Sequence, residues 1–164
     1  MGNTTIRLAT EADLRAINDI YNHYVTRSTC TYQAEPETME DRAKWFAAHG
    51  PAHPVTVAER GNEVVGWGSL SPFHRRAAYR NSVENSVYVR YDLHHQGIGS
   101  ALLKDLIDRA RAVPHHTIIA LIDASQPGSI ALHHRFNFTK VAHLKEVGHK
   151  FDRWLDVVYM QLLL

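Results

Sequence analysis

The chain has 164 residues, of which 45% are hydrophobic and 21% charged, and its formal net charge is +1 at pH 7 with histidines neutral. This length suits one domain with a proper core, and the composition excludes a disordered chain. Basic and acidic residues are interleaved, so no nucleic-acid-binding face is expected, and no apolar run approaches the ~20 residues of a membrane span.

The single cysteine, Cys30, excludes an internal disulfide framework and suits a reducing compartment. The N-terminus, residues 1–6, lacks the basic and apolar regions of a secretory signal. We therefore expect a cytoplasmic protein without a membrane partner.

The chain begins with a short predicted strand, residues 6–9. Thr10, with Asp13 three residues later, is typical of a helix cap. Apolar residues then recur every three or four positions up to Tyr24, which indicates a helix with one buried face. The stretch from residue 27 to residue 36 is predicted to be irregular.

Thr38 is placed to cap a second helix that contains Trp45 and Phe46. Residues 55–59 and 64–70, joined by a turn at Gly61-Asn62, predict an antiparallel hairpin. The second half of the chain continues the alternation of strands and helices. Its predicted strands are residues 83–89, 117–122, 140–147 and 154–163, the last two forming a hairpin across 148–153, and its predicted helices are residues 97–113 and 127–136.

A strand that runs into a glycine turn and then into a helix is the most informative local pattern. It consists of Val87-Tyr88-Val89 followed by residues 94–103, which contain Gln96-Gly97-Ile98-Gly99-Ser100. Unpaired N–H groups at a helix N-terminus, with glycines beside them, can hold a pyrophosphate, although an ordinary tight turn would look similar. Leu102 breaks the dinucleotide-binding pattern, and no Gly-Lys-Ser/Thr follows, so coenzyme A is the pyrophosphate ligand that fits.

These residues resemble the GNAT superfamily of acyl-CoA-dependent N-acyltransferases. Its pattern Gln/Arg-x-x-Gly-x-Gly/Ala maps onto residues 94–99, with His94 at the first position. Within the superfamily, the chain is most similar to the phosphinothricin and methionine sulfoximine N-acetyltransferases. That likeness rests on residues 20–25, 83–89, 129–138, 147–151 and 154–156 and covers nearly the whole chain.

The resemblance implies a single α/β (α+β) domain over residues 1–164, with a mixed, mostly antiparallel sheet of about seven strands and about four helices. Acetyl-CoA is the implied co-substrate, entering where the two central strands splay. A bulge around residues 87–89 would free backbone N–H groups for it. The residues expected to bind it are Val87, Tyr88, Val89, His95, Gln96, Gly97, Ile98, Gly99, Ser100, Gln126 and Ser129.

Two residues are predicted to carry the chemistry. An α-amino group is mostly protonated at neutral pH, so its acetylation benefits from a proton acceptor, and Glu84 is the candidate base, acting through a water. The alternative is a surface or ion-paired strand carboxylate. His133 is the candidate donor to the departing thiolate, the alternative being a histidine that only packs or bonds to a backbone carbonyl.

The implied acceptor is a small amino acid such as phosphinothricin, methionine sulfoximine or methionine sulfone. The residues expected to bind it are Phe73, His74, Arg75, Arg76, Tyr79, Glu84, Asn85 and Ser86, although the first five could form a solvated basic loop. A homodimer is implied, as for relatives. An N-acetyltransferase of another amine and an acyl-CoA-binding sensor without turnover remain alternatives.

No metal site is expected, despite twelve histidines. Three pairs are adjacent in sequence, so their side chains diverge, and neither a His-Glu-x-x-His nor a Cys-x-x-Cys spacing occurs.

Overall fold

A computed structural model describes residues 3–164; Met1 and Gly2, part of the stretch searched for a secretory signal, lie outside the described residues. In these residues one seven-stranded sheet has the order β1-β2-β3-β4-β5-β7-β6, in which only the β4–β5 pair is parallel. The predicted fold class is thereby confirmed. The strands are β1 (Thr5–Leu8), β2 (Val55–Arg60), β3 (Glu63–Pro72), β4 (Ser82–Val89), β5 (Thr117–Asp123), β6 (Thr139–Lys150) and β7 (Arg153–Leu163).

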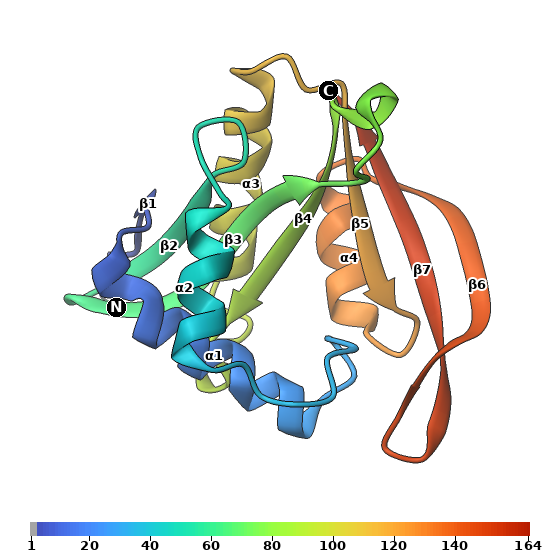
Figure 1. Cartoon of the computed structure of the whole chain (residues 1–164), viewed down its shortest axis with the longest axis horizontal. Helices are drawn as coiled ribbons and strands as arrows, with labels where there is room; N and C mark the ends of the chain where they lie inside the picture. The colour runs from blue at the N-terminus through green and yellow to red at the C-terminus, as the bar shows by residue number, and fades with distance from the viewer. Residues whose placement is uncertain (1–2) are drawn as a thin grey trace.

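The helices cover both faces of the sheet (Figure 1) and are α1 (Leu14–Arg27), α2 (Met39–Ala47), α3 (Ile98–Arg111) and α4 (Pro127–Arg135). Both predicted caps are present: Thr10 and Asp13 form a capping box, and the Thr38 side chain accepts a hydrogen bond from the Asp41 N–H. Within residues 3–164, no helix combines the length and the apolar character needed to cross a membrane.

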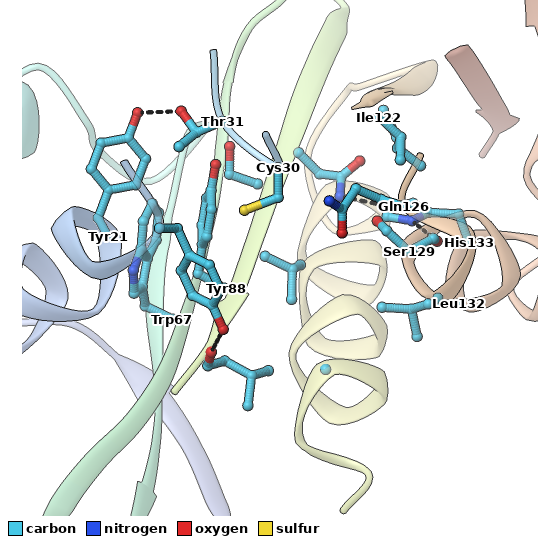
Figure 2. Close-up of a pocket in the computed structure, with 18 of the residues that line it drawn as sticks. Tyr21, Cys30, Thr31, Trp67, Tyr88, Ile122, Gln126, Ser129, Leu132 and His133 are labelled. Atoms are coloured by element: carbon cyan, nitrogen blue, oxygen red, sulfur yellow. Dashed lines mark hydrogen bonds between the residues drawn. The ribbon is translucent and has the colours of Figure 1, made fainter. Parts of the chain in front are cut away.

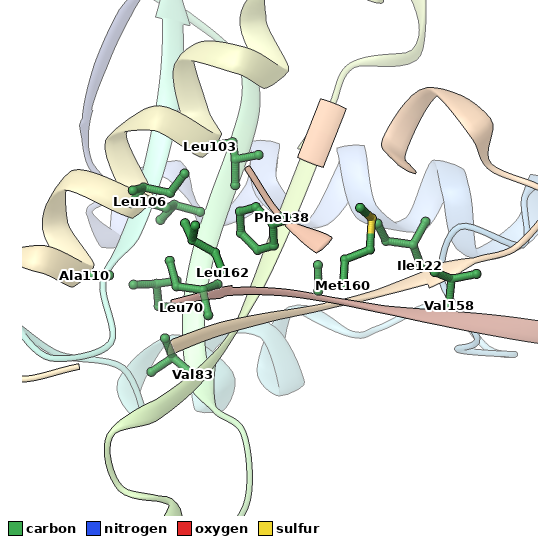
Figure 3. Packing of buried hydrophobic residues seen from close by; sticks show 13 residues of the cluster. Leu70, Val83, Leu103, Leu106, Ala110, Ile122, Phe138, Val158, Met160 and Leu162 are labelled. Atoms are coloured by element: carbon green, nitrogen blue, oxygen red, sulfur yellow. The ribbon is translucent and has the colours of Figure 1, made fainter. Parts of the chain in front are cut away.

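Two layers of apolar side chains hold the helices on the sheet. On one face, α3 and α4 pack around Phe138, together with Leu70, Leu106 and Met160 (Figure 3). On the other face, α1 packs against β2 and β3 around Trp67. The sheet is therefore a rigid wall with helices on both sides, on which a site can be built.

The two central strands diverge soon after they meet. β4 pairs with β5 only from Ser82↔Thr117 to Glu84↔Ile119, whereas it pairs with β3 as far as Val89. The expectation of a bulge around residues 87–89 is wrong, because the β3–β4 register runs without a shift. Divergence of β4 from β5, and not an inserted residue, leaves backbone groups of β4 without a strand partner.

The C-terminal hairpin is longer than predicted. Lys150 pairs with Arg153, so Phe151 and Asp152, with φ angles of 52° and 56°, form the two-residue turn in place of the predicted 148–153 connection. Gly148 lies within β6 against the Tyr32 ring, and a Cβ there would lie 2.6 Å from Tyr32 Cε2. The glycine thus permits a close contact instead of forming the turn.

Candidate functional site

A cavity of about 890 Å³ opens where β4 and β5 diverge. It is lined by the loop after α1, β3, β4, the start of α3 and α4 (Figure 2). Most of the site residues expected from the sequence line this one cavity, namely Glu84, Asn85, Ser86, Val87, Tyr88, Val89, His95, Gly97, Ile98, Gly99, Ser100, Gln126, Ser129 and His133.

The expected alternation along β4 divides this cavity into two sides. Glu84, Ser86 and Tyr88 lie opposite Ser71, Ser69 and Trp67 on β3, and the Tyr88 ring stacks on the Trp67 ring with centroids 4.9 Å apart. This side faces α1 and α2. The other side, which carries Asn85 and Val87, faces α3 and α4.

Glu84 is half-buried and lines the cavity. Burial alone raises the pKa of its carboxyl group, since no ion pair or hydrogen bond within residues 3–164 contributes to the shift. The alternative of an ion-paired strand carboxylate therefore has no partner among the described residues. A raised pKa suits a group that must accept a proton near neutral pH.

His133 is buried on the other side, and both of its ring nitrogens are engaged. Nδ1 lies 2.8 Å from the Ser129 carbonyl oxygen, which can only accept, so Nδ1 carries the hydrogen. Nε2 lies 3.0 Å from Asn85 Nδ2 and accepts from it, and burial lowers the pKa of the imidazole. His133 is thus neutral and presents no free N–H to the cavity, which favours the carbonyl-bonding alternative over a proton donor.

This contact also gives Asn85 a different place from the one expected. Its side chain points away from the Glu84 side of the sheet, and on the side that faces α3 and α4 it donates a hydrogen bond to His133. Only its Oδ1 atom is left buried without a partner in the described chain. Odd and even residues of β4 face opposite sides, so Asn85 does not share the side of Glu84. Its orientation favours a contact with His133 over the expected role in binding the acceptor.

The glycine turn at the start of α3, here termed the cradle, is the feature that the sequence predicts to hold a pyrophosphate. Gly97 has a φ of 81° and caps the helix, so α3 begins at Ile98 and not at Gly97. Gly99 and Ser100 follow in the first turn, whose N–H groups have no partner within the helix. Because Gly97, Gly99 and Ser100 all line the cavity, the residues present fit a pyrophosphate group.

Arg135 also lines the cavity and was not among the residues expected from the sequence. At the end of α4, its Nη2 atom donates to Ser100 Oγ at 3.3 Å and places a guanidinium beside the α3 N-terminus. Gln96, by contrast, does not line the cavity, and its Oε1 atom accepts from Arg60 Nη1 at 2.6 Å. This contact turns the side-chain oxygen of Gln96 toward β2.

His94, which replaces the usual glutamine or arginine, lies at the cavity mouth. The Tyr24 hydroxyl donates to the Val89 carbonyl oxygen and lies 2.6 Å from His94 Nε2. Since that hydroxyl hydrogen is already used, the His94 Nε2–H donates to the tyrosine oxygen. The His94 ring is therefore held in place beside the cradle.

A buried charge on the Glu84 side was likewise not expected from the sequence. Arg42 is 1% exposed, lies 2.6 Å from Glu37 and stacks against Tyr21, Trp45 and Trp67. Its neighbours in sequence are mostly charged, so no local pattern indicates that its side chain is buried. Only the tertiary fold brings the aromatic rings around the guanidinium and desolvates it.

The basic loop of residues 73–79 stands apart from the cavity. Arg75, Arg76 and Tyr79 are exposed and do not line it, and the Phe73 and His74 rings contact only Tyr79 among the aromatic pairs. The loop nevertheless joins β3 to β4 two residues before Glu84, at the Glu84 end of the site. Among residues 3–164, no group of three histidine, cysteine, aspartate or glutamate side chains is arranged to hold a metal.

Comparison with known proteins assigns the family. The model of the acetyltransferase (GNAT) family matches residues 17–138. The chain is 38% identical to an L-methionine sulfoximine/L-methionine sulfone acetyltransferase of Salmonella typhimurium, over 98% of this chain and 94% of that protein. It is 36% identical to a phosphinothricin N-acetyltransferase of Streptomyces coelicolor, over 95% of this chain and 94% of that protein.

Among solved structures, a GNAT superfamily phosphinothricin acetyltransferase from Sinorhizobium meliloti, in complex with acetyl-CoA, superposes with a TM-score of 0.94 and 37% identity. The match covers 98% of this chain and 88% of that one. Fold, cradle and sequence agree, and the chain belongs to the GNAT family of acetyltransferases.

Proposed function

We propose that this protein transfers the acetyl group of acetyl-CoA to the α-amino group of small amino acids such as methionine sulfoximine, methionine sulfone and phosphinothricin. The observation that carries the proposal is Glu84, a carboxylate without an ion-pair partner within residues 3–164 and with a raised pKa, on the cavity wall where β4 leaves β5. The names of the full-length relatives support the amino-acid class.

In the proposed reaction, the amine nitrogen attacks the thioester carbonyl carbon directly, so that an N–C bond forms as the C–S bond breaks. Glu84 accepts the proton of the amine through a water. Backbone N–H groups of β4 that lack a β5 partner can stabilise the negative charge on the carbonyl oxygen. The thiolate takes its proton from solvent, because His133 has no free N–H in this arrangement.

The direct test is to incubate the protein with acetyl-CoA and a panel of amines while following free thiol release. We expect release with methionine sulfone, methionine sulfoximine or phosphinothricin and none with polyamines, aminoglycosides or histone-like peptides. Turnover of a cationic amine alone would refute the acceptor class but not acetyl transfer. Acetyl-CoA binding without any turnover would favour a sensor.

The basic loop provides a test of acceptor recognition. A guanidinium binds a carboxylate or phosphinate through two parallel hydrogen bonds, and Arg76 is exposed in the connection that leads into β4, the strand of Glu84. We expect Arg76→Ala to raise the KM for the amino acid at least ~10-fold while the KM for acetyl-CoA stays unchanged. Arg80→Ala, one residue after this loop and before β4, is the control, and equal effects of both variants would point to a general charge effect.

We also propose a homodimer formed through the C-terminal hairpin. β6 is an edge strand, and large apolar side chains are exposed on it and around its turn, including Val147, Phe151 and Trp154, which is 63% exposed. Such a patch marks a protein interface. We expect sedimentation to give twice the chain mass and Trp154→Arg to give a folded monomer; a monomeric wild type would refute the proposal.

A further inference from the structure

Lys150, at the end of β6, is a buried charged residue with no part in the proposed chemistry. It is 6% exposed, and its Nζ atom donates to the carbonyl oxygens of Ser28 and Thr31, each at 2.8 Å. Within the described residues, no carboxylate lies close enough to pair with it, and burial lowers the pKa of its amino group. The Phe151 ring also lies beside it, with its centroid 5.1 Å from Nζ. A buried ammonium without a carboxylate partner is costly, so its contacts need an explanation.

The two carbonyls belong to residues 28–33, here termed the 28–33 loop, which links α1 to the segment before α2 and has no helix or strand of its own. Two hydrogen bonds within the loop, from the Cys30 N–H to Ser28 Oγ and from the Gln33 N–H to Thr31 Oγ1, shape it locally. Side chains from elsewhere tie it to the rest of the protein. Tyr32 provides a second anchor, because its hydroxyl group lies 3.0 Å from Asp123 Oδ2 and 2.8 Å from the Asp156 carbonyl oxygen. Its ring rests on Gly148, so both anchors lead to the β6–β7 hairpin.

The same loop lines the cavity with Cys30, Thr31 and Tyr32. Thr31 Oγ1 lies 2.8 Å from the hydroxyl oxygen of Tyr21, whose ring packs edge-on against Tyr88 with centroids 5.3 Å apart. Figure 2 shows Thr31 and Cys30 beside Tyr21 and Tyr88 on this side. Tyr88 shares its face of β4 with Glu84, so the 28–33 loop forms a wall of the compartment that contains the proposed base.

We propose that Lys150 is a positioning residue that fixes the 28–33 loop as the wall of the acceptor compartment, and thereby sets the affinity for the acceptor. The proposal rests on the function proposed above for its kinetic consequence, but not for the anchoring itself. The hairpin that carries Lys150 contributes no predicted catalytic residue, and on this view it acts on the site through the loop.

The chain carries its own reporter of loop release, since Cys30 is its only cysteine. The thiol is partly buried in the loop, and burial raises its pKa, so we expect its modification to be slow while the loop is anchored. Lys150→Met removes the donors and keeps a similar volume. We expect it to accelerate the reaction of Cys30 with dithiobis(nitrobenzoate) at least ~10-fold, because the loop loses two charge-assisted hydrogen bonds.

The kinetic readout separates loop positioning from a general loss of stability. For Lys150→Met, we expect the KM for the amino acid to rise ~10-fold, with kcat and the KM for acetyl-CoA changing less than ~3-fold. The matched control is Lys145→Met, which removes an exposed lysine from the same strand and should change none of these values.

Unchanged Cys30 reactivity in folded Lys150→Met, or equal rises in both KM values, would overturn the proposal. If Lys150→Met does not fold, Tyr32→Phe tests the same wall, because it removes the second anchor's hydrogen bonds and leaves Lys150 in place. It should also speed thiol modification and raise the acceptor KM, and its failure to do either would overturn the proposal. If the wild type acetylates no amino acid, the proposed function fails, whereas the thiol measurement still decides the anchoring.

Discussion

Replacing Glu84 with glutamine should lower kcat by about 10²–10⁴-fold near neutral pH and leave the Kd for acetyl-CoA unchanged. Glutamine keeps the size of the side chain and its ability to hydrogen-bond but cannot accept the proton. Because Glu84 faces the α1 side and the cradle lies at the start of α3, the change should not disturb cofactor binding. Stopped-flow thiol release and calorimetry measure the two quantities.

The pH dependence gives the sign of the effect. A base acts in its ionised form, and burial raises the pKa of Glu84, so wild-type kcat should rise with pH through that raised pKa and then level off. The glutamine variant should lack this rise. Glu40→Gln, at an exposed position on α2, is the matched control. A variant with near-normal turnover, when chemistry limits the rate, would make Glu84 structural.

Replacing Gly99 with valine should weaken acetyl-CoA binding roughly 100-fold, about 2.7 kcal/mol. A Cβ at this position would lie 3.4 Å from Leu132 Cδ2 and 3.7 Å from Val89 Cγ2, both ordinary contacts, so the helix can keep its fold. The two further methyl groups would occupy the cavity beside the α3 N-terminus, where a phosphate must approach the backbone. Calorimetry on the variant measures the loss.

Gly50→Val is the control, since nothing lies within 4 Å of a Cβ at Gly50 and this residue does not line the cavity. Gly97 is a poorer choice for this test, because its φ of 81° strains any other residue and would confuse binding with folding. A normal circular dichroism spectrum with an unchanged Kd for Gly99→Val would contradict the placement of the pyrophosphate.

The sequence predicts those features that depend on neighbouring residues. The period of apolar positions identifies α1 and α3, Thr10 and Thr38 mark helix starts, and the two-residue period of β4 places Glu84, Ser86 and Tyr88 on one face. The cradle follows in the same way, because a glycine turn before a helix is a local pattern. These are the parts of the site that were expected and found together.

The features that were missed depend on contacts between distant segments. Arg42 is surrounded by charged residues in sequence but by aromatic rings in space. Lys150 belongs to the β6–β7 hairpin, yet it donates a hydrogen bond to Thr31, 119 residues away in sequence. The β4 bulge was expected by analogy, whereas the backbone is freed by β5 turning away. No period or spacing in one chain reports such pairings, so structure was needed to find them.

The brief β4–β5 pairing, from Ser82 to Glu84, is the only strand pairing in the described residues that joins β1–β4 to β5–β7–β6, and these two halves share the core around Phe138 (Figure 1). A molecule that fills the gap and contacts β4 and α4 together acts as a removable cross-link between the halves. Ligand that binds only the folded protein adds about 2.7 kcal/mol to its stability at 100 times Kd. On the proposed function, resistance to unfolding is therefore coupled to the supply of the acetyl donor that the protein consumes.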